Sequence, residues 1–358
     1  MLSVLSILFF TFLVTYFLIP VLIDVSKIKH LFDDNLETRK IHIQRTPNLG
    51  GIAIYTALLL GSGILIKASL VPWFNYFIAG SFIIALIGVK DDLVGLDPMK
   101  KIVAQIAAAF IMAYMADIRI TSFYGLAGIY ELPLWLSVAF TMLVSIFLYN
   151  AMNLLDGIDC LATGIGVIAC FTYAVCFYMM GNKGECLLAL ALGGALIAFL
   201  FYNYSPAKIF MGDSGSLTIG FILAILSVRF IELNKNGAVP AVRFHSAPAI
   251  AIGILIIPVY DTLRVFFLRL WLKRSPFKAD NNHLHHRLVY LKFSHIQSSL
   301  ILILINLVSI AMVFLLQKAG NMPLICGLLL LALCTNIILW TMKSKRKAAG
   351  RFHLQKAA

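Results

Sequence analysis

Eleven apolar runs divide this sequence, and most are long enough to cross a bilayer as a helix of about 20 residues. Hydrophobic residues make up 61% of the chain and charged residues only 13%, about half the share in a soluble domain. A soluble globule could not hide so much apolar surface, so we exclude a cytosolic or secreted enzyme and expect an all-α, polytopic membrane protein. The predicted spans cover residues 2–23, 50–66, 73–89, 102–116, 133–149, 161–180, 187–202, 215–230, 247–270, 299–317 and 323–342.

Basic residues set the predicted orientation, because Lys and Arg collect in cytoplasmic loops. Counted on alternate sides of the spans, 22 of the 29 Lys and Arg lie on one side and 7 on the other. This places the N-terminus outside and the C-terminus in the cytoplasm. The net charge of +13 therefore indicates cytoplasmic loops and no nucleic-acid partner. The first run lacks the basic start of a signal peptide, so we expect it to be retained as a span.

Acidic residues gather on the same predicted cytoplasmic side, which holds twelve of the sixteen Asp and Glu. Ionisable groups near the bilayer midplane, typical of transporters, are missing from the predicted spans. The chemistry is therefore expected at one membrane face. We expect one transmembrane catalytic domain over residues 1–342 and a basic cytoplasmic tail over 343–358. Its active-site loops are predicted at residues 24–49, 90–101, 150–160, 203–214 and 271–298.

Two adjacent carboxylates, Asp91 and Asp92, follow the third predicted span. Neighbours on a helix point about 100° apart, so separate roles are more natural than one metal ion bound by both. The competing interpretation is a solvated loop that carries the turn residues Gly95, Asp97 and Pro98.

Polar residues recur every third position at Asn150, Asn153, Asp156 and Asp159, and would share one face of a helical turn. This loop carries no Lys or Arg to offset its carboxylates, which favours a bound cation. Hard oxygen ligands suit Mg²⁺, which also keeps water and phosphate ligands. The alternative is a helix cap made by one of the two aspartates.

The segment from Asn203 to Leu217 separates the seventh and eighth predicted spans. Gly212 and Gly215 allow close backbone approach, and Asp213 could cap the next helix. A helix N-terminus at this face would also attract phosphate. A plain cap remains the alternative.

The longest predicted cytoplasmic loop follows Asp261 and Arg264, which form an i,i+3 ion pair typical of structural roles. It contains His283, His285 and His286, but the absence of nearby Cys argues against zinc. A basic, imidazole-rich loop suits a diphosphate or a phosphosugar, and a loop facing anionic lipid is the alternative. The first loop, with Lys40 and Thr46, either contacts a lipid phosphate or only enforces orientation.

Taken in order, these segments resemble the polyprenyl-phosphate N-acetylhexosamine-1-phosphate transferases, a family of the glycosyltransferase family 4 type. The resemblance runs from about Arg39 to His286 and includes RTPNLGG, GVKDDLVGLDP, NLLDGIDCLATG, NYSPAKIFMGDSGSLTIGF, PVYDTLR and HLHH. Leu284 interrupts the histidines, as in the undecaprenyl-phosphate GlcNAc-1-phosphate transferase branch. The branch that transfers phospho-MurNAc-pentapeptide for peptidoglycan has an uninterrupted triplet and is the alternative.

The resemblance implies that a sugar 1-phosphate, most simply GlcNAc-1-phosphate, moves from a UDP-sugar to undecaprenyl phosphate. The products would be undecaprenyl-diphospho-sugar and UMP, at the start of O-antigen, common-antigen or teichoic-acid synthesis in lipopolysaccharide or cell-wall biogenesis. It also implies a bacterial inner membrane, an active site on the cytoplasmic face, and Mg²⁺ or Mn²⁺ as cofactor. The expected partners are the UDP-sugar, the polyprenyl phosphate and the membrane, with a homodimer left open.

Site roles follow from the resemblance, residue by residue. Asp159 and Asp213 match the family's metal-binding carboxylates. The predicted catalytic residues are Asp91, Asp92, Asp156 and Asp159, with Asp91 and Asp92 near the lipid phosphate. Because the second phosphate pKa is about 6, the acceptor is largely dianionic and a direct single displacement is favoured over a covalent aspartyl intermediate. The predicted substrate-binding residues are Lys40, Thr46, Asn153, Asn203, Arg269, His283, His285 and His286.

Overall fold

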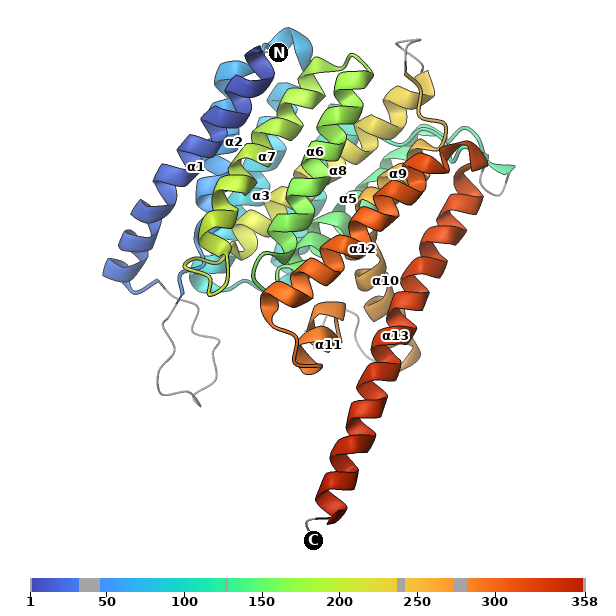
Figure 1. Ribbon diagram of the computed structural model, residues 1–358. Coiled ribbons are helices and arrows are strands. Elements are labelled where there is room, and N and C mark those ends of the chain that lie inside the picture. Colours follow the sequence, from blue (N-terminus) through green and yellow to red (C-terminus); the bar gives the residue numbers. More distant parts are fainter. Residues whose placement is uncertain (1, 32–45, 126–127, 237–241, 274–281, 357–358) are drawn as a thin grey trace.

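The computed structural model describes residues 2–31, 46–125, 128–236, 242–273 and 282–356, with the backbone alone at 2, 236 and 343–356. It is a bundle of helices (Figure 1) in which the described residues form no strand beyond one isolated bridge, Ser122 to Glu131. The helices are α1 (Leu2–Lys29), α2 (Gly50–Leu65), α3 (Phe74–Val94), α4 (Pro98–Phe110), α5 (Leu134–Leu155), α6 (Leu161–Met179), α7 (Lys183–Asn203), α8 (Gly212–Asn236), α9 (Ala247–Ile254), α10 (Ile256–Trp271), α11 (Leu284–Tyr290), α12 (His295–Leu315) and α13 (Asn321–Lys356). Short turns η1 (Ala68–Leu70), η2 (Ile111–Met115) and η4 (Gln317–Ala319) join or extend them.

Every predicted span is helical, so the all-α class is confirmed. Within the described residues, seven helices are long and apolar enough to cross a membrane, and α9 with α10 makes an eighth if this bent pair is one span. The total of eleven crossings stays a prediction. α1 starts at one end of the bundle and α13 finishes beyond the other (Figure 1), as an odd number of crossings requires.

The predicted span over 247–270 is broken, because α9 and α10 meet at 81°. Pro258 lies in the first turn of α10 and has no N–H to donate to the carbonyl of Ile254, so the helix restarts at Ile256. Apolarity alone could not reveal this break. The bend directs the second half of the segment toward α11 and α13.

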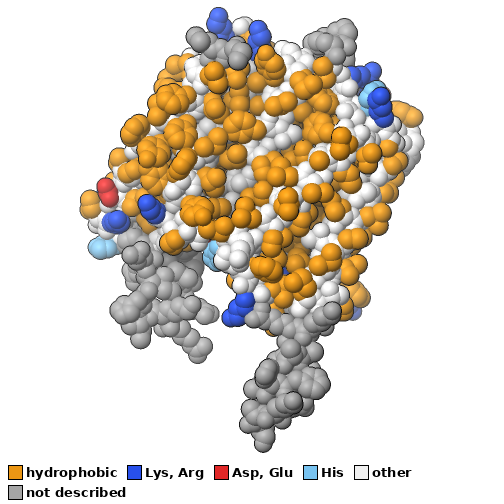
Figure 2. Space-filling model, viewed as in Figure 1, with side chains coloured by type: hydrophobic (Ala, Val, Ile, Leu, Met, Phe, Trp, Pro, Cys, Tyr) orange, Lys and Arg blue, Asp and Glu red, His pale blue; other side chains and the backbone are white. Residues whose placement is uncertain are grey.

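The sides of the bundle are apolar, as Figure 2 shows, and the Lys and Arg side chains on this face lie near its two ends. Large side chains such as Phe9, Phe17 and Leu304 are more than half exposed. In water such a surface would drive association, whereas in a bilayer it contacts lipid. The chain is therefore a polytopic membrane protein.

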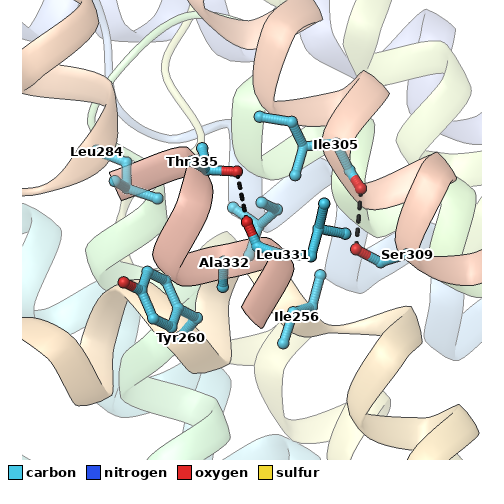
Figure 3. A pocket seen from close by; sticks show the side chains of 9 residues that line it. Ile256, Tyr260, Leu284, Ile305, Ser309, Leu331, Ala332 and Thr335 are labelled. Carbon is cyan, nitrogen blue, oxygen red and sulfur yellow. Dashed lines mark hydrogen bonds between the residues drawn. The ribbon is translucent and has the colours of Figure 1, made fainter. Parts of the chain in front are cut away.

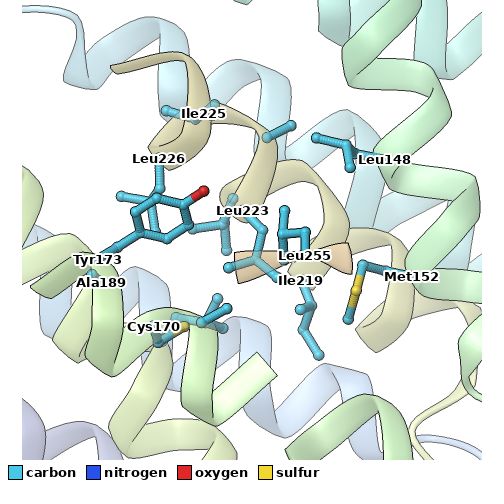
Figure 4. Packing of buried hydrophobic residues seen from close by; sticks show 14 of the residues in the cluster. Leu148, Met152, Cys170, Tyr173, Ala189, Ile219, Leu223, Ile225, Leu226 and Leu255 are labelled. Carbon is cyan, nitrogen blue, oxygen red and sulfur yellow. The ribbon is translucent and has the colours of Figure 1, made fainter. Parts of the chain in front are cut away.

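The core centres on α8, which packs against α5, α3 and α2. Figure 4 shows Leu148 and Met152 of α5 beside Ile219 and Leu223 of α8, with Tyr173 of α6 nearby. The Tyr173 hydroxyl pairs with Ser227 Oγ at 2.7 Å, so this buried polar group is satisfied. The core thus holds α8 rigidly in the middle of the bundle.

A glycine seam joins the start of α8 to α2 and α3; we use this term for Gly51, Gly88, Gly212 and Gly215. A Cβ on Gly51 would lie 2.0 Å from the Gly215 nitrogen, and one on Gly88 would lie 2.4 Å from the Ser214 Cα. The close approach expected at Gly212 and Gly215 is therefore present, and Gly212 also has a φ of +70°. Backbone hydrogen bonds complete the seam: Gly50 N to Phe210 O at 3.0 Å and Gly51 N to Met211 O at 2.8 Å.

The end of the bundle where α8 finishes carries a separate polar network. Glu232 accepts hydrogen bonds from the Thr121 nitrogen at 2.8 Å and the Thr121 hydroxyl at 2.7 Å. Lys235 lies 2.9 Å from Glu131 and also donates to Thr121. These contacts tie the loop between η2 and α5 to α8. We call this end the opposite end.

Candidate active site

A cavity of about 320 Å³ lies at the end of the bundle where α8 begins. Four of the predicted site carboxylates line it, together with amide, backbone and imidazole groups. We call it the acidic cavity. Its lining residues are Asn48, Asp92, Asn153, Asp156, Gly157, Ile158, Asp159, Asn203, Phe210, Gly212, Asp213 and His295.

Asp92 caps α8 from a neighbouring helix. Its carboxylate accepts hydrogen bonds from the backbone nitrogens of Asp213 at 2.7 Å and Ser214 at 3.0 Å. These N–H groups have no partner within α8, and a carboxylate at a helix N-terminus is also favoured by the helix dipole. Asp92 therefore fixes the position of Asp213 in the first turn of α8, a positioning contact that the sequence did not indicate.

Lys101 lies between two of the acids and was not among the predicted site residues. Its ammonium group is 3.2 Å from Asp91 and also contacts Asp213 directly. Asp97 caps α4 by accepting from Met99 N at 2.8 Å, which places Lys101 one turn into that helix. Asp91 faces Lys101 and does not line the cavity, so Asp91 and Asp92 do have separate surroundings.

Asp213 is also held from α5. Asn153 Nδ2 donates to Asp213 Oδ1 at 2.7 Å and to Ser216 Oγ at 2.9 Å. Asn150 does not join this set, because its side chain pairs with Gln105 at 2.7 Å and 3.2 Å. The expected polar face of four residues is thus wrong in part, since α5 ends at Leu155 and the two aspartates follow it in a loop.

Asp159 is held by α12. His295 Nδ1 lies 3.4 Å from its carboxylate, and Ser299 Oγ donates to its backbone carbonyl at 2.7 Å. His295 lines the acidic cavity and was also missed by the sequence patterns. Asn203 lines the same cavity but has a supporting role, because its amide accepts from Cys160 N at 2.9 Å and donates to Ile209 O at 3.3 Å.

The carboxylates differ in proton affinity. Burial raises the pKa of Asp92 to about 7, and the charge of Asp91 adds to the rise. Burial also raises the pKa of Asp156 to about 7, reinforced by the charges of Asp92 and Asp159. Burial likewise opposes ionisation of Asp159, but hydrogen bonds from His295 and Ser205 outweigh it and lower its pKa. The cavity therefore concentrates negative charge that a cation would relieve.

The histidines lie next to the cavity. His285 is buried against Gly157, where a Cβ would come within 2.3 Å of its Nε2 atom. Burial, followed by the charge of His286, lowers the pKa of His285 to about 3, so this ring is neutral at physiological pH. His283 is also buried, with its Nδ1 atom 3.0 Å from Asp261 Oδ2.

Thr46 and Arg269 are not among the residues that line the cavity. Thr46 lies four residues before the start of α2, and Arg269 is buried within α10. Lys40 lies outside the described residues. The substrate-binding roles given to these three residues stay predictions.

The lining residues fit a hard divalent cation. Aspartate and asparagine oxygens predominate, and such ligands suit Mg²⁺. Among the described residues, no three Asp, Glu, His or Cys side chains converge on a single point. Mg²⁺ commonly takes one or two carboxylates and completes its shell with water and phosphate, so a protein-only cage is not required.

Comparison of the sequence with known proteins identifies one family. Residues 74–231 match the family described as glycosyl transferase family 4. The decaprenyl-phosphate N-acetylglucosaminephosphotransferase of Mycolicibacterium smegmatis is 34% identical, covering 74% of this chain and 70% of the relative. The chain belongs to glycosyl transferase family 4.

Two further relatives in the family bear on the branch. A probable undecaprenyl-phosphate N-acetylglucosaminyl 1-phosphate transferase of Bacillus subtilis is 34% identical, covering 84% of this chain and 81% of its own length. A phospho-N-acetylmuramoyl-pentapeptide-transferase of Staphylococcus carnosus is 32% identical but covers 61% of this chain, with 73% of its own length. The resemblance to polyprenyl-phosphate N-acetylhexosamine-1-phosphate transferases is confirmed.

Proposed function

We propose that the chain transfers GlcNAc-1-phosphate from UDP-GlcNAc to undecaprenyl phosphate and releases UMP. The observation that carries this proposal is the acidic cavity, in which carboxylates from three separate segments meet at one end of an apolar bundle. A lipid phosphate and a water-soluble nucleotide can meet only at such an end. The longer matches to N-acetylglucosamine phosphotransferases favour this donor over the pentapeptide donor.

The proposed reaction is a single displacement. An oxygen of the lipid phosphate attacks the donor phosphorus that carries the sugar. The bond from that phosphorus to the bridging oxygen breaks, and UMP leaves with the electron pair. Since the acceptor phosphate is largely dianionic at neutral pH, a strong base is not needed. Asp91 and Asp92 would then act by positioning other groups, Asp91 the ammonium group of Lys101 and Asp92 the first turn of α8.

The chain's own residues arrange charge for this step. Asp159 and Asp213 would hold Mg²⁺, which when bound offsets phosphate charge in the transition state. Lys101 already contacts Asp213, and its ammonium group would contact a phosphate oxygen of a substrate bound beside Asp213. Asp92 keeps the first turn of α8 in place through its two backbone hydrogen bonds. His283, His285 and His286 would bind the donor beside Gly157.

The predicted setting is a bacterial inner membrane with the acidic cavity on the cytoplasmic side. Bacterial relatives support the bacterial membrane, and the Lys and Arg distribution supports the orientation. Labelling of single cysteines placed at either end of the bundle, with a membrane-impermeant reagent in intact cells, would test it.

A labelled donor tests the reaction itself. Purified protein is given undecaprenyl phosphate, Mg²⁺ and UDP-GlcNAc with radiolabel in the β-phosphate. We expect label in the lipid product and equimolar UMP. Release of UDP with an unlabelled lipid would instead identify ordinary glycosyl transfer. UDP-MurNAc-pentapeptide in the same assay separates the two branches, and we expect no transfer from it.

A further inference from the structure

The HLHH segment is held in place by one buried carboxylate on α10. Asp261 is 3% exposed, and its Oδ2 atom lies 3.0 Å from His283 Nδ1. The backbone nitrogen of Leu284 donates to both oxygens of Asp261, at 3.1 Å and 3.2 Å. One side chain thus binds a histidine ring and the first peptide group of α11.

Arg264 completes this clamp. It donates from Nη2 to Asp261 Oδ1 at 2.7 Å and also to the carbonyl of Asn282. The i,i+3 ion pair expected from the sequence is present, but Asp261 also binds the HLHH segment and Arg264 also binds the residue before it. The pair therefore connects α10 to a segment more than fifteen residues away in the chain.

Leu284 is the apolar part of the same attachment. It is 2% exposed and lines a small cavity of about 10 Å³ with Tyr260 of α10 and Leu331 and Ala332 of α13 (Figure 3). A leucine between the histidines thus anchors the segment in the bundle by burial. On the next turn, Arg287 Nη1 donates to Asn336 Oδ1 of α13 at 2.6 Å.

These attachments fix the histidine rings relative to the acidic cavity. The rings of His283 and His285 are nearly parallel, with centroids 5.7 Å apart. His285 in turn fills the space against Gly157, which lines the cavity. A displacement of His283 would therefore move the ring that packs against the cavity wall.

We propose that Asp261 is a positioning residue for donor binding, which sets the orientation and Nδ1-protonated form of His283 and, with Leu284, presses His285 against Gly157. The inference rests on the proposed function, because it takes the UDP-sugar as the ligand of the histidines. A carboxylate that accepts from one ring nitrogen fixes which nitrogen faces the ligand, and this is a common way to orient a functional imidazole. Leu284 is a second anchor, and because it is apolar it can stiffen the segment without forming hydrogen bonds to the ligand.

The test compares UDP-GlcNAc affinity in Asp261→Asn and wild-type protein by titration calorimetry in detergent. The amide keeps the side-chain shape but cannot accept at both positions, so we expect binding at least tenfold weaker. In transfer assays, KM for the donor should rise similarly, while KM for undecaprenyl phosphate stays within twofold. Asp117→Asn is the matched control, since Asp117 forms an exposed ion pair with Arg119; its affinity should be unchanged.

Leu284→Ala provides a second, independent variant in case Asp261→Asn does not fold. It leaves every Asp261 hydrogen bond possible, and we expect the same donor-specific loss of affinity. Unchanged UDP-GlcNAc affinity in a folded variant, or equal loss for both substrates, would overturn the positioning role. Wild-type protein that binds UDP-GlcNAc but releases no UMP would refute the proposed transfer and leave the affinity test of Asp261 intact. A wild-type protein that does not bind the nucleotide would refute both.

Discussion

Carboxylate side chains occur at both ends of the bundle, but their surroundings differ. At the opposite end, Glu185 pairs with Arg229 at 2.5 Å, and Glu232 takes both donors of Thr121. At the end with the acidic cavity, which we call the acidic end, Asp91 and Asp213 both contact Lys101. Asp156 there lies near the charges of Asp92 and Asp159. Carboxylates matched to partners hold loops in place. Carboxylates crowded around a cavity are costly for folding, and such sites are typically functional.

Loss of a carboxylate at the acidic end should give the largest effect. Asp159→Asn removes a negative charge from the proposed metal site, so we expect transfer to fall at least about 1,000-fold. Membrane insertion and Tm should be nearly unchanged. Initial rates of UMP release, compared with those of Asp117→Asn, provide the measurement. Substantial activity in Asp159→Asn would remove this residue from the metal site.

Removal of divalent cations should have a comparable effect on transfer. Treatment with EDTA is expected to abolish UMP release, and added Mg²⁺ or Mn²⁺ should restore it. The physical reason is that the crowded carboxylates and two anionic substrates need a cation between them. Measurement of UMP in metal-stripped protein decides the point, since transfer without metal would contradict the cation requirement.

Lys101 offers a smaller test of the same end. Lys101→Met keeps much of the side-chain length and removes its charge, and we expect a loss of about 10–100-fold in kcat/KM. Lys101→Arg should retain most activity because the positive charge remains. Steady-state kinetics at saturating Mg²⁺ separate these outcomes. Equal kcat/KM values for Lys101→Met and the wild type would mean that Lys101 is only a structural ion-pair partner.

The opposite end should respond in stability and not in catalysis. Glu185→Gln leaves the partly buried Arg229 without its carboxylate, which should destabilise the fold by about 3 kcal/mol. Arg229 also lies 5.8 Å from the Trp73 ring, a contact that should persist. Thermal unfolding in detergent measures the loss. The rate of UMP release per folded molecule should stay at the wild-type value, and a rate defect would erase the contrast between the ends.

Proton linkage should give the smallest effect. In the folded chain the pKa values of Asp92 and Asp156 are about 7, above the ordinary value of 3.8. Between about pH 4 and pH 7 the folded state therefore holds protons that the unfolded state has released, so stability falls as pH rises through this window. Without metal, we expect Tm to be lower at pH 8 than at pH 5.5 by about 5 °C. Asp156→Asn should flatten this dependence, as scanning fluorimetry can show.

Helices were easier to predict from the sequence than their ends and breaks. Each apolar run forms a helix, because backbone groups inside a bilayer must be satisfied locally. Within the predicted basic tail over 343–358, the backbone continues α13 as far as Lys356, and the cytoplasmic location of the tail stays a prediction. Lys, Arg and Ala favour helix even without apolar periodicity. The break before α10 depends on the local geometry at Leu255 and Pro258, which the apolar pattern does not encode.

The candidate site was predictable where its signal is local. The adjacent or regularly spaced acids included Asp92, Asp156 and Asp159, and the segment between the seventh and eighth predicted spans supplied Asp213; all four line one cavity. Lys101 and His295 were missed because Lys101 meets Asp213, and His295 meets Asp159, across more than one hundred residues of sequence. No short-range pattern records such a meeting. The capping role of Asp92 was hidden for the same reason, since its partners are backbone atoms of α8.

The glycine seam has a consequence for how the membrane acts on the enzyme. At Gly51 and Gly88 the nearest atoms across it belong to the backbone of α8, which cannot absorb a shift by changing rotamer. If a change in bilayer thickness alters the tilt of α2 or α3, the first turn of α8 should therefore move with them. Turnover in vesicles should accordingly vary with acyl-chain length, even when both substrates are saturating.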